Sequence, residues 1–313
     1  MAAGRFAPSP TGDLHLGNLR TAVLAWLWSR QAGDRFVLRM EDLDRVTSKR
    51  ELEERQARDL TAIGLDWDGP VLRQSERFDR YATAIDELDR AGRLYPCFCT
   101  RKEIAAAASA PNHPAPSGYP GTCRELTAAR RHELEASGRP PALRLRSGDE
   151  PVEFDDEVLG PTVLPAEDIV VRRNDGVAAY HLAVVVDDAA QGVGIVVRGD
   201  DLATSTPGQI LLQRRLGLPT PRYAHVPLVL SPTGARLAKR DGSVTLDDRR
   251  ALGDRPIDVS RWLLATSGQR AVDAATPAAT LAAAAEHFDA AALPRTPVRV
   301  SDDLLHHSLP SAR

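Results

Sequence analysis

The sequence is poor in the features that build disulfide frameworks, membrane spans and secretion signals. It holds three cysteines, Cys97, Cys99 and Cys123, an odd and clustered set that makes a poor disulfide framework. No apolar run approaches the roughly 18 residues that suggest a membrane span. The N-terminal stretch MAAGRFAPSP has no apolar core behind a basic start, which argues against a signal peptide. We therefore expect a cytoplasmic protein with no membrane partner.

Two common nucleotide-binding signatures are also missing. No Gly-x-x-x-x-Gly-Lys-Ser/Thr loop occurs in the sequence. The pair Gly192 and Gly194 is followed by Val197 at the position where the dinucleotide fingerprint needs a third glycine. P-loop hydrolysis and hydride transfer therefore have no support.

Composition and net charge do not show whether the protein binds a nucleic acid. Hydrophobic residues make up 42 % of the 313 residues, enough for a sizeable core in one large domain or two smaller ones. The formal net charge of -3 does not select a nucleic-acid partner, so RNA would have to be bound by local basic pairs. A solvated surface is the simpler alternative for each pair. The pairs are Arg144/Arg146, Arg172/Arg173, Arg214/Arg215 and Arg249/Arg250.

Short β-branched runs alternate with helical patterns along most of the chain. Leu19, Val23 and Leu27 recur at helical spacing after Asn18, and Gly33 marks the end of that helix. This alternation predicts an α/β fold with parallel strands. Strands are expected at residues 4–7, 35–40, 168–172, 177–187, 193–198 and 225–230, and helices at residues 18–32, 48–63 and 281–292.

Residues 97–123 break this rhythm and contain all three cysteines, which predicts an insertion in the α/β fold. Three sulfurs and one further ligand would complete a tetrahedral zinc site, and a closed site of that kind is structural. His113 is a candidate for the fourth ligand, because histidine is a common zinc ligand. Free buried cysteines are the alternative.

The segment His15-Leu-Gly17-Asn18 stands where a strand and loop lead into a helix. The unpaired N–H groups and positive dipole end of a helix N-terminus bind phosphate, and His15 can donate a further hydrogen bond. Gly17 lets an adenine ring approach the backbone, because it has no Cβ. The alternative is that His15 only caps the helix or lies on the surface.

A basic loop lies far downstream, with Arg236, Lys239 and Arg240 after a Ser-Pro-Thr-Gly turn. Several positive charges in one loop suit a polyphosphate whose charge must be stabilised while pyrophosphate leaves. A solvated turn is the alternative for this loop taken alone.

Together, His15-Leu-Gly-Asn18 and Arg236-Leu-Ala-Lys239-Arg240 resemble the paired His-Ile-Gly-His and Lys-Met-Ser-Lys-Ser signatures of class I aminoacyl-tRNA synthetases. Further stretches look like the glutamate branch of this family: residues 5–15, Leu38-Arg-Met-Glu-Asp-Leu-Asp44, Asp175-Gly-Val-Ala-Ala-Tyr180, Val184-Val-Val-Asp-Asp188, and Val197-Arg-Gly-Asp-Asp-Leu202 with Ser205-Thr-Pro207 and Gln209. The resemblance covers residues 4–245 in order. It implies a Rossmann-like catalytic core that activates L-glutamate with Mg²⁺ and ATP.

The resemblance also implies roles for individual residues. His15 and Lys239 would be catalytic, and ATP would be bound by His15, Gly17, Asn18 and Lys239. An arginine presents a planar fork that matches a carboxylate, and Glu41 can hold an ammonium group. The alternative for Arg5 and Arg198 is a structural ion pair. The residues implied around glutamate are Arg5, Ala7, Ser9, Glu41, Tyr180 and Arg198.

Within the family, the cysteine pattern and the length resemble the short glutamyl-queuosine tRNA(Asp) synthetases. That likeness implies Tyr119 as the fourth zinc ligand beside Cys97, Cys99 and Cys123, and the queuosine base of tRNA(Asp) as acceptor. It further implies glutamate activation without tRNA. We also expect a monomer that lacks an anticodon-binding domain. The expected segments are 1–96 and 177–235 for the catalytic domain, 97–123 for the zinc-binding insertion, 124–176 for an acceptor-side connection, and 236–313 for the basic loop and a short helical region.

Three alternatives remain open at this point. The chain could be a truncated glutamyl-tRNA synthetase that charges a tRNA 3′ end, or an amino-acid ligase with a small-molecule acceptor. It could also be an inactive RNA-binding relative that kept its fold.

Overall fold

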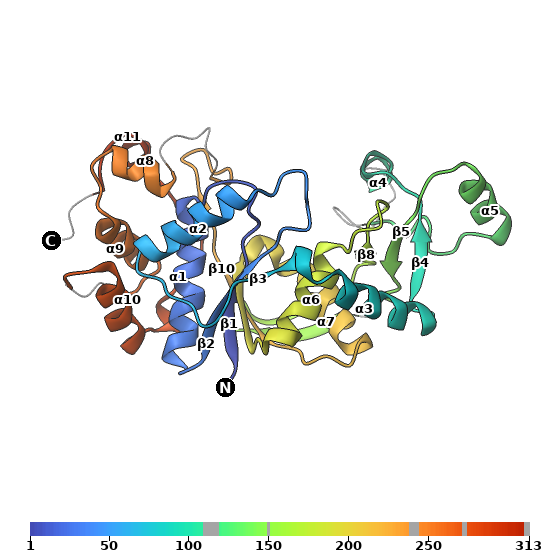
Figure 1. Ribbon diagram of the computed structural model, residues 1–313, viewed down its shortest axis with the longest axis horizontal. Coiled ribbons are helices and arrows are strands. Elements are labelled where there is room, and N and C mark those ends of the chain that lie inside the picture. The colour runs from blue at the N-terminus through green and yellow to red at the C-terminus, as the bar shows by residue number, and fades with distance from the viewer. Residues whose placement is uncertain (109–118, 149–150, 238–243, 271–273, 310–313) are drawn as a thin grey trace.

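The computed structural model describes residues 1–108, 119–148, 151–237, 244–270 and 274–309 (Figure 1). The helices are α1 (Leu16–Gln31), α2 (Arg50–Ala62), α3 (Phe78–Arg90), α4 (Arg101–Ala108), α5 (Ala128–Ala136), α6 (Tyr180–Gln191), α7 (Thr206–Arg215), α8 (Leu246–Ala251), α9 (Pro256–Thr266), α10 (Pro277–Glu286) and α11 (Asp302–His306). The strands are β1 (Ala3–Phe6), β2 (Arg35–Met40), β3 (Leu72–Arg73), β4 (Leu94–Cys97), β5 (Ala142–Leu145), β6 (Pro151–Asp156), β7 (Gly160–Pro165), β8 (Val170–Arg172), β9 (Ile195–Gly199), β10 (Arg222–Val226), β11 (Val229–Leu230) and β12 (Val298–Arg299). Short 3-10 turns cover Gln74–Glu76, Asp200–Ser205 and Ala290–Ala292.

The central sheet is mostly parallel, as the alternation of strands and helices predicted. Strands β1, β2 and β3 pair in parallel, and β9 pairs in parallel with β10. A parallel bridge between Ala3 and Val193 joins these two groups next to β1. β6 pairs in parallel with β10, and β7 adds an antiparallel strand at that edge. The α/β, Rossmann-like fold is therefore confirmed.

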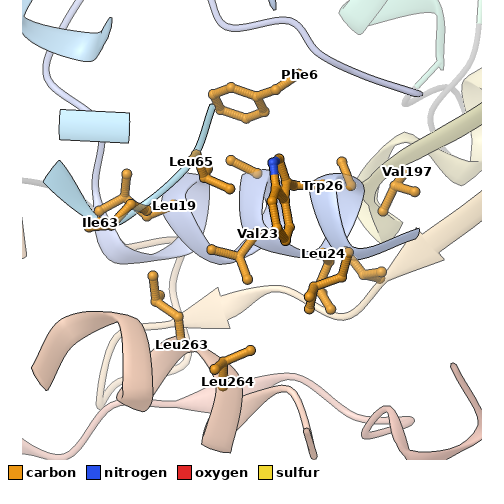
Figure 2. Packing of buried hydrophobic residues seen from close by; sticks show 14 of the residues in the cluster. Phe6, Leu19, Val23, Leu24, Trp26, Ile63, Leu65, Val197, Leu263 and Leu264 are labelled. Atoms are coloured by element: carbon orange, nitrogen blue, oxygen red, sulfur yellow. The ribbon is translucent and has the colours of Figure 1, made fainter. Parts of the chain in front are cut away.

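Helix α1 crosses from β1 to β2 and is buried on almost every side, because the sheet covers one face and α9 and α10 cover another. Figure 2 shows Leu263 and Leu264 of α9 on one side of α1 and Phe6 and Leu65 on the other. A helix with apolar residues on most of its sides needs such enclosure to be stable in water. The helix N-terminus is thereby held rigidly at one edge of the sheet.

The strand expected at residues 177–187 is wrong, because α6 occupies Tyr180–Gln191. A continuous apolar run satisfies a buried helix as well as a buried strand, so periodicity could not separate the two. The strand expected at residues 225–230 is divided into β10 and β11, since Pro227 between them has no N–H to donate to a sheet. The helix expected at residues 281–292 begins earlier, at Pro277, and ends at Glu286.

A smaller antiparallel sheet lies at the end of the molecule opposite α9 and α10 (Figure 1). It has the order β4-β5-β8, and Cys97 is the last residue of β4. Beside it a separate apolar cluster contains Tyr95, Phe98 and Cys123. The segment boundaries at residues 97, 123, 176 and 235 stay a prediction. Within the described part of the chain, no helix has the length and apolar character needed to cross a bilayer.

Candidate active site and cysteine cluster

A cavity of about 930 Å³ opens between the parallel sheet and the small antiparallel sheet. Ser9 follows β1 and Glu41 follows β2, so both come from the carboxyl ends of adjacent parallel strands. Open α/β sheets bind their ligands at this edge. Tyr180, the first residue of α6, lines the same cavity from the other side. Three of the residues implied around glutamate are thus brought together.

Arg5 lies behind this cavity rather than on its surface. Its side chain is 5 % exposed, and its Nε donates to Asp188 Oδ1 at 3.3 Å. Its Nη1 donates to the carbonyl oxygen of Val197 at 3.1 Å. The structural ion pair considered for Arg5 is therefore present. The pair does not remove Arg5 from the site, because its charge acts on Glu41 and Tyr180.

Glu41 is a largely buried acidic residue that lines the cavity. Its Oε1 lies 3.4 Å from Arg39 Nη2, and its side chain is 10 % exposed. Burial raises the pKa of Glu41, and the charges of Arg39 and Arg5 only partly offset that rise. A carboxylate in such a place gains from a ligand cation, because an ammonium group would compensate its lost hydration. The geometry is therefore suited to an amino group.

Arg198, near the end of β9, is 5 % exposed and is held by neutral partners. Its Nη1 donates to Gln209 Oε1 at 2.7 Å, its Nη2 to Thr206 Oγ1 at 2.8 Å, and its Nε to His225 Nε2 at 3.1 Å. Among the described residues, no carboxylate forms a salt bridge with Arg198. The structural ion pair considered for this residue is thus not seen in that part of the chain.

His15 is the N-cap of α1, which confirms the capping role considered for it as an alternative. Its Nδ1 accepts from the Asn18 N–H at 3.2 Å, and Asn18 Oδ1 accepts from the His15 N–H at 3.1 Å. Burial and then the charge of Arg236 lower the pKa of His15. A neutral ring whose Nδ1 accepts must carry its proton on Nε2, so capping leaves a second donor for a phosphate.

Gly17 has a role that the sequence did not reveal. A Cβ at this position would lie 3.0 Å from both Cε1 and Nδ1 of His15. The absence of a side chain therefore makes room for the histidine ring. Ala7, Ser9 and Asn18 line a second cavity of about 360 Å³ at the mouth of α1. Ser9 belongs to both cavities, so the two adjoin.

Lys239 and Arg240 lie outside the described residues. Arg236 forms an ion pair with Asp201, which follows β9. At the other flank, the Val244 carbonyl oxygen accepts from the Leu16 N–H at 2.9 Å. The chain therefore returns to the N-terminus of α1 directly after the basic loop.

The three cysteines form a cluster, and their sulfur atoms all lie within 4.8 Å of one another. A tetrahedral site with Zn–S bonds of about 2.3 Å places its sulfurs about 3.8 Å apart, so this set fits zinc with little movement. Tyr119 Oη lies 3.4 Å from Cys97 Sγ and accepts from the Cys123 N–H at 2.7 Å. His113 lies outside the described residues.

Several residues that hold the site were given no role from the sequence, although Arg39, Asp188 and Gln209 lie in stretches that resemble the glutamate branch. Arg39 and Asp188 hold Arg5 and Glu41, and Gln209 and His225 hold Arg198. Asp187 and Asp188 follow an apolar run, and charged residues in such a place are usually paired. That signal could have identified Asp188. His225 gave no comparable signal.

Several known proteins are similar to this chain in sequence and in fold. The family model for tRNA synthetases class I (E and Q), catalytic domain, matches residues 2–269. A glutamyl-Q tRNA(Asp) synthetase of Nocardia farcinica is 55 % identical over 301 residues, covering 96 % of this chain and 94 % of the relative. One of Symbiobacterium thermophilum is 50 % identical and covers 96 % of each chain. The crystal structure of a glutamate tRNA ligase from Elizabethkingia meningosepticum in complex with its amino acid has a TM-score of 0.78 and 27 % identity, covering 96 % of this chain and 67 % of that one.

Proposed function

The chain belongs to the class I tRNA synthetase family for glutamate and glutamine, and on that premise we propose that it is a glutamate-activating ligase. It uses ATP to form glutamyl-adenylate and then transfers the glutamyl group to the queuosine base of tRNA(Asp). The observation that carries this proposal is the cavity that brings Glu41 and Tyr180 together beside the mouth of α1. The names of the similar proteins from Nocardia farcinica and Symbiobacterium thermophilum support the acceptor.

Glutamate binds with its ammonium group near Glu41 and with carboxylates directed to the side of Arg5 and Arg198. These two guanidinium groups are the buried positive charges that act on Tyr180, and Tyr180 lines the cavity. A glutamine side chain would leave one desolvated guanidinium without its anion. Sites that depend on such polar partners can reject the wrong ligand by as much as about 10⁴-fold.

In the first step the α-carboxylate of glutamate attacks the α-phosphorus of ATP. A new P–O bond forms, the bond to the β-phosphate oxygen breaks, and pyrophosphate leaves. His15 Nε2–H donates to the developing negative charge, the positive end of the α1 dipole stabilises it, and Lys239 contributes a positive charge. Mg²⁺ bound to ATP neutralises the phosphates. No protein nucleophile is needed, because the adenylate is itself activated.

In the second step a hydroxyl group of the modified nucleoside attacks the glutamyl carbonyl carbon and AMP leaves. We propose that activation does not require tRNA. The cavity of about 930 Å³ is at the upper end of the range for small-ligand pockets and adjoins the smaller cavity at the mouth of α1, which supports a site for both glutamate and ATP. Zinc bound by Cys97, Cys99, Cys123 and Tyr119 would hold β4 against the following segment as a structural metal.

Pyrophosphate exchange tests the first step. Purified protein is given labelled pyrophosphate and ATP with glutamate, aspartate or glutamine, each without tRNA. Exchange with glutamate alone supports the proposal. Exchange that appears only after tRNA is added would contradict tRNA-independent activation, and no exchange under either condition would favour an inactive RNA-binding relative.

Mapping the product tests the second step. tRNA(Asp) with and without queuosine is incubated with labelled glutamate and then digested to nucleosides for mass analysis. Glutamate on the queuosine nucleoside, and only in the modified tRNA, is expected. Label on the 3′-terminal adenosine would instead identify a synthetase that charges the tRNA end.

A further inference from the structure

A buried chain of polar groups leads from the end of β6 to Arg198. It begins at Asp156, the last residue of β6, and continues to His225 in β10. Both side chains are 0 % exposed, and Asp156 Oδ2 lies 2.6 Å from His225 Nδ1. The other carboxylate oxygen accepts from the backbone N–H groups of Val158 and Leu159 at 3.0 and 2.9 Å. Asp156 is therefore fully used as an acceptor and cannot move without breaking several bonds.

The tautomer of His225 follows from Arg198 on one side of the ring and Asp156 on the other. Thr206 Oγ1 also lies 3.1 Å from Nε2. Arg198 Nε can only donate, so His225 Nε2 at 3.1 Å must accept. The ring proton is then on Nδ1, where it is donated to Asp156. Burial lowers the pKa of His225, and the bond to Asp156 only partly offsets this, which agrees with a neutral ring. Asp156 thus selects the tautomer that presents a lone pair to Arg198.

The charge of Arg198 is left uncompensated by this arrangement. Its partners His225, Gln209 and Thr206 are all neutral, and no carboxylate in the described part of the chain pairs with it. Gln209 Nε2 in turn lies 3.3 Å from His181 Nδ1, and His181 lines the large cavity. The neutral partners fix the orientation of the guanidinium while its positive charge stays available for an anion from outside the protein.

We propose that the Asp156–His225 pair is a positioning element that orients Arg198 toward a carboxylate of the bound amino acid. This inference rests on the proposed glutamate activation and adds two residues that determine its specificity. A carboxylate in the place of His225 would neutralise Arg198 and compete with the substrate. A neutral imidazole held by Asp156 instead restrains Arg198 without that competition, because it offers one directed acceptor and no charge.

Two substitutions of similar size separate positioning from general structural support. In His225→Gln the side-chain oxygen can reach the place of Nε2 and still accept from Arg198. In His225→Asn the amide can still donate to Asp156, but the shorter side chain offers no acceptor to Arg198 Nε. We expect His225→Asn to raise the KM for glutamate in pyrophosphate exchange at least about tenfold, as loss of a hydrogen bond to a charged group does. The KM for ATP should stay within about twofold.

His225→Gln should keep the KM for glutamate within about threefold of the unchanged protein. Equal KM increases in both variants, or parallel increases for glutamate and ATP, would show a merely structural role and overturn the inference. Absence of glutamate-dependent exchange in the unchanged protein would instead contradict the proposed function. The two failures are therefore distinguishable.

A measurement on the unchanged protein keeps the inference testable if both variants unfold. The ¹⁵N shifts of the His225 ring report its tautomer, and its stacking on Tyr223, with ring centroids 6.0 Å apart, allows assignment through space. A proton on Nδ1 and a bare Nε2 at neutral pH are expected. A proton on Nε2, or on both nitrogens, would overturn the inference.

Discussion

Arg5 and Arg39 share one carboxylate oxygen, since their nearest nitrogens lie 3.3 and 2.7 Å from Asp188 Oδ1. The two arginines come from the neighbouring strands β1 and β2, and Asp188 comes from α6. Burial alone would lower the pKa of Arg39, but Asp188 and Glu41 outweigh it and hold that pKa above its ordinary value. Asp188 therefore compensates the charges of two buried arginines behind the cavity.

Replacing Asp188 by Asn should destabilise the fold and weaken glutamate binding. Breaking a buried ion pair from one side leaves uncompensated charge and costs about 3–5 kcal/mol. We expect the free energy of unfolding measured in urea to fall by that amount. The KM for glutamate should rise more than the KM for ATP. Glu157→Gln is the control, because its pair with Arg222 is exposed and should contribute less than about 1 kcal/mol. Similar small losses of unfolding free energy in both variants would contradict the conclusion that Asp188 compensates the charges of Arg5 and Arg39.

The two roles of His15 can be separated by the choice of substituent. His15→Asn keeps a good N-cap for α1, whereas His15→Ala does not. Both remove the Nε2–H donor, so both should lower pyrophosphate exchange about 100-fold or more. Only His15→Ala should lose about 1 kcal/mol of unfolding free energy. Near-normal exchange in His15→Asn would show that the residue acts only as a cap.

Gly17→Ala should act through the His15 ring, which a Cβ would approach to 3.0 Å. We expect slower exchange in the single variant, because the ring must shift from its place at the helix mouth. Added to His15→Ala, the same substitution should have little further effect, since the ring is already gone. Exchange rates of the two single variants and the double variant form the test. Additive effects would point instead to a direct clash with the nucleotide.

Metal analysis should find about one zinc per chain, and its removal by a chelator should lower the Tm, because a structural site contributes to folding. Cys123→Ser should abolish retention of the metal. Tyr119→Phe should weaken zinc binding about tenfold or more in chelator competition, whereas His113→Ala should leave it unchanged. Weaker zinc binding in His113→Ala, with unchanged binding in Tyr119→Phe, would assign the fourth ligand to His113.

Stability should depend on pH through Asp59 in α2. Burial, with Asp247 adding to it, raises the pKa of Asp59 to about 6. The folded chain therefore holds this proton more tightly than the unfolded chain, so the contribution is full below about pH 4 and is lost as pH rises through 6. Asp59→Asn should raise the unfolding free energy by about 1–3 kcal/mol at pH 7.5 and much less at pH 4.5.

Asp258 provides a control of opposite sign, because its bonds to Arg255 lower its pKa. Its stabilising contribution is present at neutral pH and is lost as the carboxyl takes up a proton in acid. Asp258→Asn should therefore reduce stability slightly at pH 7.5. A gain from Asp59→Asn that is equal at both pH values would contradict the titration account.

The sequence alone determined the parallel α/β fold, the cysteine cluster and the helix start at His15, because these features depend on residues that lie close together in the sequence. Strand and helix periods, turn residues and spacings such as Cys97-x-Cys99 can all be recognised without a partner. The sequence also placed Ser9 and Glu41 after two strands that the structure confirms.

Only the tertiary structure decided which distant residues meet. Most of the run at residues 177–187 lies in helix α6, although its apolar pattern fits a buried helix and a buried strand alike. Asp188 meets Arg5 across 183 positions of sequence, and His225 meets Asp156 across 69. The compensation of the Arg5 charge and the tautomer of His225 depend on these long-range contacts. No local pattern of residues shows which partners meet.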